Sequence, residues 1–449
     1  MHVRIISIFL LIFFSSACDK DEKHAAVEQS SPPNIVFIIS DDQAWNDYGF
    51  MGHSVIETPH LDQLARESLT FSRGYVAAPL CSPSLATIMS GLYPHQHGIT
   101  GNDPSFTSEQ QKYSAAWRTE RSQVFRPSIE NYNDLPLLTK RLEKLGYLSF
   151  QTGKWWMGSW KESHFTHGMT HGDPQRMGRH GDEGLRIGRE GLKPIYDFIS
   201  EAEEKDKPFF LWYAPFLPHA PHTPPEELFE KYKDKAPTPA IANYWAMCEW
   251  FDQTCGELLA HLESKQLTKE TLVVYVCDNG WIQEPDKPNR YAARSKRTPY
   301  EGGIRTPLMF RWPGKITPAI NETTLASSID IVPTVLAACK LEKDEDLPGI
   351  NILNADALKE RSSIFAEAYE HDIASLEDPT LSLTHRIGLS YPWKMIIPDQ
   401  TNRPDDSIQL YDLSQDPFEK ENVIEKYPSE AQNLSDQLDA WWTPEHLKK

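Results

Sequence analysis

Cys81 begins the run of residues with the clearest chemical meaning in this 449-residue chain, CSPSLATIMSG over residues 81–91. Pro83 favours the first turn of a helix, where its missing N–H leaves no hydrogen bond unmade. The free backbone amides of that turn direct positive potential toward the cysteine. The run therefore predicts a reactive side chain at a helix N-terminus rather than a buried structural thiol.

Oxygen-bearing side chains follow two other runs whose composition predicts strands. Asp41-Asp42 follow the apolar residues 34–40, and Asp278-Asn279 follow the apolar residues 271–277. Either pair alone would be expected in an exposed polar turn. Adjacent carboxylates repel each other, however, and parallel strands bring their carboxyl ends to one edge of a sheet. The four side chains together predict an all-oxygen site for Ca²⁺ or Mg²⁺ rather than Zn²⁺.

Basic side chains stand in three further motifs, each next to a predicted strand. A lone lysine is most simply a solvated surface charge, but a fixed cation in a dry site stabilises an anionic transition state. A histidine has a pKa near neutrality and can donate a proton to a departing oxygen. The motifs are TGKW with Lys154, KRTPYEGGIRTP with Lys296, and FLPHAPH with His219 and His222, either of which could be the donor. His95 and His97, in YPHQHG, are expected to be structural or to support the site indirectly.

Buried strands alternating with helices must position these residues. Apolar runs rich in β-branched residues indicate strands buried on both faces, and helices are expected at 134–145 and around 242–263. The alternation predicts an α/β fold with a large, mostly parallel sheet flanked by helices. The Gly-, His- and Arg-rich segment 159–191 predicts a long functional loop. The strands are expected at 34–40, 147–151, 208–214, 271–277 and 307–312.

These motifs, in this order, resemble those of the sulfatase family. The run at 81–91 is similar to the signature C-x-P-S-R followed by Thr-Gly or Ser-Gly, and the segment 296–307 is similar to K-x-T-x-x-E-G-G-x-R-x-P. LYDL at 410–413 and the terminal helix that follows resemble the closing segment of sulfatases. The resemblance implies an alkaline-phosphatase-like sandwich with a smaller C-terminal α+β subdomain.

The resemblance also implies a cofactor and a set of roles. In this family the signature cysteine is oxidised to formylglycine, whose hydrate attacks sulfur, and this implies a formylglycine-generating or anaerobic maturation enzyme as a partner. An unmodified Cys81 thiolate at a helix N-terminus is the alternative nucleophile, but it lacks the second hydroxyl through which a hydrate releases sulfate. The implied Ca²⁺ ligands are Asp41, Asp42, Asp278, Asn279 and an oxygen at position 81. The implied catalytic residues are Cys81, Lys154 and Lys296, which grip the sulfate, and His219, which protonates the leaving oxygen.

Two positions depart from the family pattern. Leu85 stands where the family has Arg, and Trp156 stands where the family usually has His. In the family both of these side chains contact the formylglycine hydrate. Their joint loss indicates a divergent branch with compensation, or an impaired enzyme. Basic residues of the segment 159–191 are candidates for the compensation: Arg176, Arg179 and His180.

Composition and charge narrow the range of partners. The net charge of −19 at pH 7 disfavours nucleic acid, because phosphate backbones need a basic surface. An anionic substrate would depend on cations concentrated in the site. The six cysteines include no C-x-x-C pair, which predicts neither a disulfide framework nor a thiolate metal site.

A targeting segment is expected at the N-terminus. Arg4 precedes the apolar residues 5–14, a run too short to span a bilayer. The following Ser-Ser-Ala-Cys resembles a bacterial lipobox, so we expect cleavage before Cys18, lipidation of Cys18, and an outer-membrane lipoprotein facing the periplasm or the cell surface. A simple secretory signal is the alternative.

The expected organisation is a lipoprotein signal peptide at 1–17, a linker at 18–33, a sulfatase catalytic domain at 34–344 and a C-terminal subdomain at 345–449. The expected function is a sulfuric ester hydrolase acting on a sulfated carbohydrate. Aromatic rings suit sugar faces, and tryptophans lie near the motifs: Trp155, Trp156, Trp160 and Trp281. The alternatives are a phosphodiesterase or phosphonate hydrolase of the same fold, and a catalytically impaired protein that binds sulfated glycans.

Overall fold

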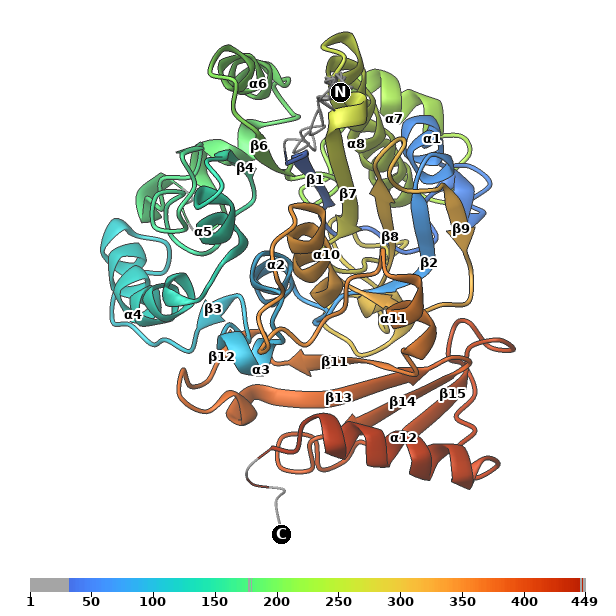
Figure 1. Ribbon diagram of the computed structural model, residues 1–449. Coiled ribbons are helices and arrows are strands. Elements are labelled where there is room, and N and C mark those ends of the chain that lie inside the picture. The colour runs from blue at the N-terminus through green and yellow to red at the C-terminus, as the bar shows by residue number, and fades with distance from the viewer. Residues whose placement is uncertain (1–31, 177, 179, 445, 447–449) are drawn as a thin grey trace, which may run out of the picture. The chain divides into compact units, whose positions relative to one another are not determined.

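A large, mostly parallel sheet lies at the centre of the computed structural model, which describes residues 32–176, 178, 180–444 and 446 (Figure 1). Its strand order is β10-β2-β8-β7-β1-β6-β4-β5, with β9 paired to β2. Strand β8 runs antiparallel to β7 and to β2, and the other pairs are parallel. The bounds are β1 Asn34–Ser40, β2 Leu69–Tyr75, β4 Leu148–Gly153, β5 His167–Gly168, β6 Phe209–Ala214, β7 Thr271–Cys277, β8 Arg305–Arg311, β9 Ala319–Asn321 and β10 Ala326–Ser327.

The predicted strands are all present. The bounds of β1 and β7 are those expected from the sequence, and β4, β6 and β8 differ from expectation by one or two residues at an end. Strand β2 was not predicted, because its sequence LTFSRGY breaks the apolar pattern with Ser, Arg and Gly.

Helices cover both faces of this sheet because alternate strand residues point to opposite sides. Ile35, Phe37 and Ile39 pack with α2, α5 and α10, whereas Val36 and Ile38 pack with α1, α6 and α8. These helices are α1 Pro59–Arg66, α2 Cys81–Ser90, α5 Leu138–Glu143, α6 Lys193–Glu204, α8 Pro239–Ser264 and α10 Ile331–Ala338. The other α-helices are α3 Pro94–His97, α4 Ala115–Asp134, α7 Glu226–Tyr232, α9 Glu301–Ile304, α11 Ala355–Glu360 and α12 Pro428–Trp441. Short 3-10 helices span Gly49–Met51, Pro174–Arg176, Asp182–Arg186, Thr268–Glu270, Ser328–Asp330 and Pro379–Ser382.

The helix expected at 134–145 is shorter than predicted. Asp134 is the last residue of α4, and α5 begins only at Leu138. Pro136 separates the two helices, since a residue before proline avoids the helical region, and Leu135 is extended with ψ 159°. The helix around 242–263 is confirmed as part of α8.

A second, antiparallel sheet follows the first, in the order β11-β13-β14-β15. Helix α12 packs on it through Leu434 and Leu438, which meet Met395 and Leu410 (Figure 1). The sheet begins at Ile364, and the start of a subdomain at residue 345 stays a prediction. Its strands are β11 Ile364–Tyr369, β13 Leu383–Ser390, β14 Trp393–Pro398 and β15 Gln409–Asp412, and a separate two-stranded pair joins β3 Asp103–Pro104 to β12 Asp372–Ile373.

Within the described residues, none of the helices combines the length and the hydrophobicity needed to cross a membrane. The predicted signal peptide and Cys18 lie outside the described part of the chain.

Candidate active site

The carboxyl ends of β1 and β7 bring the predicted acidic side chains together. The two strands are neighbours, with Ser40 in register with Cys277. Asp42 has a left-handed backbone with φ 63°, and its amide donates to Asp278 Oδ1 at 3.2 Å. Asn279 Nδ2 donates to Asp42 Oδ1 at 2.7 Å. Two segments more than 230 residues apart in sequence therefore form one buried site.

Three buried oxygen atoms of this site accept no hydrogen bond from the described residues: Asp41 Oδ2, Asp42 Oδ2 and Asn279 Oδ1. Burial raises the pKa of Asp41 well above its ordinary value, and the nearby charge of Asp278 raises it further. Buried acceptors without donors are costly unless a cation meets them. The donor set therefore fits a hard cation that takes oxygen ligands, such as Ca²⁺.

Cys81 is the first residue of α2 and lies beside these oxygens. One ligand atom from each of Asp41, Asp42, Cys81 and His219 lies within 4.8 Å of every other. Burial raises the pKa of the Cys81 thiol to about 11, although Lys154 and Lys296 oppose the shift. The cysteine is thus at the predicted helix N-terminus, but as an unmodified thiol it stays protonated at neutral pH.

Both predicted lysines reach the same site. Lys154 Nζ lies 2.6 Å from Asp41 Oδ1 and 3.3 Å from Asp278 Oδ2. Lys296 Nζ lies 2.5 Å from Asp42 Oδ1 and 3.0 Å from Cys81 Sγ. Burial lowers the pKa of each ammonium, but the neighbouring negative groups outweigh it and hold the pKa above its ordinary value. Both side chains are therefore fixed cations.

Gly153 explains how β4 delivers Lys154. Its φ is 79°, and a Cβ at this position would lie 1.8 Å from the carbonyl oxygen of Ala214 on β6. The amide of Lys154 donates to that same oxygen at 2.7 Å. Only glycine allows this close approach, which turns the chain so that Lys154 enters the site.

Of the two candidate proton donors, His219 is the one beside the acidic cluster. Its Nε2 lies 3.5 Å from Asp42 Oδ2, and its ring stacks on Phe216 at 4.1 Å between centroids. Burial, Lys154 and Lys296 lower the pKa of His219 well below its ordinary value, and the negative charge of a bound substrate would raise it again. The ring of His222 packs instead near Tyr244 and Trp281, and burial lowers its pKa to about 4.

Sequence analysis did not identify Arg189, which holds the His219 turn. Its guanidinium donates to the carbonyl oxygens of Phe216 at 2.7 Å and His219 at 3.3 Å. The group also lies 5.8 Å from the centroid of the Phe216 ring. A single arginine in a long loop has no motif around it, so only the fold reveals its partners.

His95 and His97 each contact another element of the fold, which fits either a structural role or an indirect support of the site. His97 Nε2 pairs with Thr87 Oγ1 of α2 at 3.1 Å, and burial lowers the pKa of this histidine to about 3. His95 Nδ1 contacts the Glu367 carboxylate of β11, and its ring stacks on Trp442 with centroids 4.2 Å apart.

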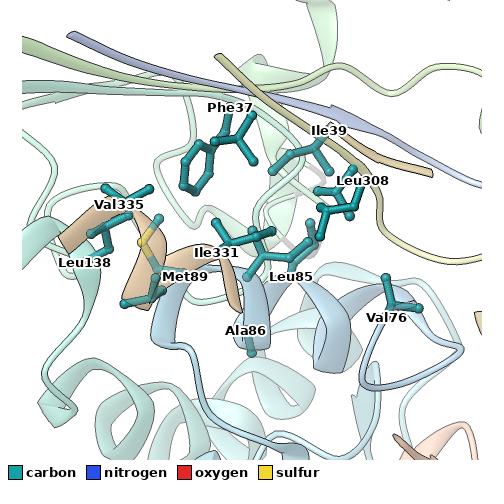
Figure 2. Close-up of a cluster of buried hydrophobic side chains, with 14 of the residues drawn as sticks. Phe37, Ile39, Val76, Leu85, Ala86, Met89, Leu138, Leu308, Ile331 and Val335 are labelled. Carbon is teal, nitrogen blue, oxygen red and sulfur yellow. The ribbon is translucent and has the colours of Figure 1, made fainter. Parts of the chain in front are cut away.

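Leu85, at the first departure from the family pattern, belongs to the hydrophobic core. It is 2% exposed and joins the cluster on the α2 side of the sheet. Figure 2 shows it on α2 near Ile331, facing Ile39 and Leu308. An apolar side chain in this place packs against the sheet and donates no hydrogen bond to position 81.

Trp156, at the second departure, packs on His180 with ring centroids 4.6 Å apart. The His180 ring lies 6.3 Å from that of His219, so His180 is the candidate for compensation that the structure places at the site. Arg176 is exposed and pairs with Glu183 at 2.8 Å. Arg179 lies outside the described residues.

Two family models match most of this chain. The family model named Sulfatase matches residues 33–341, and that named N-sulphoglucosamine sulphohydrolase, C-terminal, matches residues 291–443. The chain is 29% identical over 360 residues to N-acetylgalactosamine-6-sulfatase of Homo sapiens, covering 72% of this chain and 65% of that protein. It therefore spans just under two thirds of that relative's length.

A bacterial relative covers more of the chain. An ulvan-active sulfatase of Formosa agariphila is 24% identical over 491 residues, covering 97% of this chain and 87% of that protein. The crystal structure of Ps i-CgsB in complex with k-i-k-neocarrahexaose superposes with a TM-score of 0.71 at 23% identity, covering 91% of this chain and 92% of that one. That likeness establishes the alkaline-phosphatase-like fold. Because the Sulfatase model matches well over half of its residues, the chain belongs to the sulfatase family.

Proposed function

We propose that this protein is a sulfuric ester hydrolase that removes sulfate from a sulfated carbohydrate, using a formylglycine derived from Cys81 and a bound Ca²⁺. The main observation behind the proposal is that Cys81 lies beside two fixed cations and the oxygen-rich edge of the sheet. Lys296 connects Cys81 to that edge, because its Nζ lies within 3.0 Å of both Cys81 Sγ and Asp42 Oδ1.

Ca²⁺ would be held by Asp41, Asp42, Asp278 and Asn279. The three carboxylates exceed the two ammonium groups of Lys154 and Lys296 by one negative charge, which would repel a sulfate. A bound Ca²⁺ would reverse the sign of the site and polarise the sulfate oxygens. This charge balance supports a divalent cation together with an anionic substrate.

The residues of the chain would bind and orient the sulfate. Lys154 and Lys296 would each donate to its oxygens, where charge develops in the transition state. His219 would give its proton to the oxygen that leaves with the sugar, and Arg189 would hold the turn that aims it. Formylglycine at position 81 would supply a hydroxyl nucleophile. Near-complete burial of Cys81, Lys154 and Asp42 limits water and strengthens these interactions.

Sulfated glycans are proposed as substrates because of the relatives and the aromatic surroundings of the site. One matched protein is named for its activity on ulvan, and a matched structure contains a carrageenan oligosaccharide. Trp156 and His180 also place aromatic surface next to His219.

His180 is the residue we propose to orient groups at position 81 in place of the family histidine.

The decisive experiment is a sulfate-release screen over oligosaccharides from ulvan, carrageenan and glycosaminoglycans, with wild type and Cys81→Ala. We expect release by the wild type and none by the variant. Turnover of aryl phosphodiesters without sulfate release would support the phosphodiesterase alternative. Glycan binding that survives Cys81→Ala, without any turnover by the wild type, would support an impaired binding protein.

Mass spectrometry tests the modification separately, because Leu85 departs from the motif that the maturation enzyme reads. Co-expression with a formylglycine-generating enzyme should convert the tryptic peptide containing Cys81 to the aldehyde form. An intact, alkylatable thiol at this position in an active preparation would exclude formylglycine as the nucleophile.

We also propose that the protein is anchored to the bacterial outer membrane through lipid on Cys18. The lipobox-like sequence before this residue supports the anchor. Growth with a labelled fatty acid should label the wild type and not Cys18→Ala, which should appear in the soluble periplasmic fraction. Equal labelling of both proteins would exclude the anchor at this residue.

A further inference from the structure

A cleft of about 750 Å³ lies next to the candidate active site and has no role in the steps above. Its volume is within the range of about 300–1,000 Å³ that is usual for ligand sites. One wall is helix α4, which lies beside the β3–β12 pair (Figure 1). Its lining also includes Trp156 and His180. Because the His180 ring is 6.3 Å from that of His219, the cleft adjoins the catalytic residues.

Three aromatic rings line this cleft as a connected group. Trp117 of α4 lies 5.5 Å from Phe106 and 5.4 Å from Tyr113, measured between ring centroids. Tyr113 is 64% exposed, which makes it the most exposed of the large hydrophobic residues in the described chain. Exposed aromatic rings with a polar edge suit ligands that are apolar on one face and hydroxylated around the rim. A pyranose ring has this character.

Cations stand next to the aromatic group. Lys112 Nζ lies 5.1 Å above the Tyr113 ring, and Arg118 Nη1 donates to the Gln175 carbonyl at 3.2 Å. That second contact ties α4 to the segment Pro174–Arg176, which packs against the helix. In a chain with a net charge of −19, basic side chains gathered at one cleft favour a polyanionic ligand.

The acidic groups of the cleft are matched by bases. Asp103 pairs with Arg121, and Asp372 Oδ1 lies 2.6 Å from His371 Nδ1. The pairing of Asp103 with an arginine argues against a second cation site among these residues. Lys112 and Arg118, which also line the cleft, are then the cations beside the aromatic group, and they favour anionic substituents on a sugar chain.

We propose that this cleft binds the sugar chain of a sulfated oligosaccharide, with Phe106, Tyr113 and Trp117 against sugar faces and Lys112 and Arg118 beside sulfates other than the one removed. The proposal rests on the proposed function, because the cleft would bind the sugar chain whose sulfate is removed at the neighbouring site. It makes the substrate an extended, multiply sulfated glycan rather than a monosaccharide sulfate.

The test compares two substrates in variants of α4. The measured quantity is the ratio of kcat/KM for a sulfated hexasaccharide from ulvan or carrageenan to kcat/KM for an aryl sulfate. Trp117→Ala and Arg118→Ala should each lower this ratio about 10–100-fold, the size expected for an anchor residue of an interface. Arg126→Ala is the matched control, since Arg126 is an exposed arginine of α4 that pairs with Glu130 and Glu162 outside the cleft. Its ratio should stay within about twofold of wild type.

Direct binding separates this proposal from the proposed function. Binding of the same hexasaccharides to Cys81→Ala is measured by calorimetry, with and without Trp117→Ala or Arg118→Ala in addition. We expect binding that weakens about 10–100-fold in each double variant. Binding with this pattern but no sulfate release by the wild type would support the cleft and reject the hydrolase. Sulfate release with unchanged substrate ratios, or binding unaffected by both second substitutions, would overturn the cleft and leave the hydrolase standing.

Discussion

Two buried clusters of charge in this protein have similar composition and differ in how completely their atoms are paired. The site cluster consists of Asp41, Asp42, Cys81, Lys154, Asp278, Asn279 and Lys296. The anchoring cluster consists of Tyr75, Glu301, Arg305, Lys394 and Glu419, and it joins the second sheet to the EGG segment near Lys296. Lys394 of β14 is fully buried and lies 3.1 Å from Glu301 Oε1 and 2.8 Å from Glu419 Oε1.

In the anchoring cluster three of the four carboxylate oxygens accept a hydrogen bond, and the fourth, Glu419 Oε1, accepts none but lies 2.8 Å from Lys394 Nζ. Glu301 Oε2 accepts from Tyr75 Oη at 3.1 Å and lies 3.5 Å from Arg305, while Glu419 Oε2 accepts from the amide of Glu301 at 2.6 Å. The site cluster instead leaves three buried oxygens without a donor among the described residues. Carboxylates that meet cations and hydrogen-bond donors of the protein itself indicate a structural role, whereas several unpartnered acceptors gathered at one place indicate a ligand.

The largest expected effect is on the anchoring cluster. Lys394→Met should lower the free energy of unfolding by about 3–5 kcal/mol, because it leaves two buried glutamates without their ammonium partner. Urea denaturation measures this change. Lys426→Met, at an exposed lysine of the same C-terminal region, should change it by less than about 0.5 kcal/mol. Adding Glu419→Gln to Lys394→Met should recover part of the loss, and a double variant as unstable as the sum of the single ones would contradict the pairing.

Lys296→Met, the equivalent change in the site cluster, should instead affect activity. We expect kcat for sulfate release to fall about 100–1,000-fold, the loss typical of one missing donor to a transition state. With Ca²⁺ present, unfolding should change by less than about 1 kcal/mol, since the cation then compensates Asp42. Lys315→Met is the exposed control. A stability loss as large as that of Lys394→Met would show that both clusters are structural.

The sequence allowed prediction of the site cluster and not of the anchoring cluster, for a physical reason. Asp41, Asp42, Asp278 and Asn279 follow strongly apolar strands, and a parallel sheet brings such strand ends to one edge. Cys81, Lys154 and Lys296 stand in motifs that resemble those of the sulfatase family. Lys394 has no such pattern around it, and its partners Glu301 and Glu419 lie on a helix end and in a loop. Their meeting depends on how the two sheets pack, which local patterns do not encode.

The cleft was not predicted because helix α4, which forms one of its walls, was not predicted. Helix α4 has the sequence AAWRTERSQVFRPSIENYND, with Pro127 inside it and few apolar residues at helical spacing. Such a segment gives neither a clear helical period nor a clear end. The core position of Leu85 was also not predicted. The family motif has a catalytic-site residue at this position, whereas in this chain Leu85 packs with Ile39 and Leu308.

Removing calcium tests the unpaired oxygens directly. Ca²⁺ at about 100 times its dissociation constant should raise the free energy of unfolding by about 2.7 kcal/mol relative to protein in EGTA. Asp278→Asn should reduce this response, whereas Lys315→Met should retain it. Thermal unfolding with and without Ca²⁺ provides the measurement. Identical curves under both conditions would place the site cluster in the same structural class as the anchoring cluster.

Asp47 offers the smallest and most specific test, because it is a buried carboxylate whose hydrogen-bond donors are neutral. Oδ2 accepts from Tyr244 Oη at 2.6 Å and from the amide of Ala44 at 3.3 Å. Burial raises the pKa of Asp47 from 3.8 to about 7, so the folded protein binds this proton more tightly than the unfolded chain.

The protein should therefore lose stability as pH rises from about 4 to about 7, through the range between the two pKa values of Asp47, and keep that loss above pH 7. Asp47→Asn retains an acceptor for both donors and cannot ionise. The variant should match wild type near pH 4 and become more stable by about 1–2 kcal/mol above pH 7, less than the roughly 4 kcal/mol of a fully expressed shift. Urea denaturation across this range measures the difference. A difference in the free energy of unfolding between the two proteins that is constant with pH would mean that Asp47 ionises as freely in the folded state as in the unfolded chain. Burial alone would then not distinguish a paired carboxylate from an unpaired one in this chain.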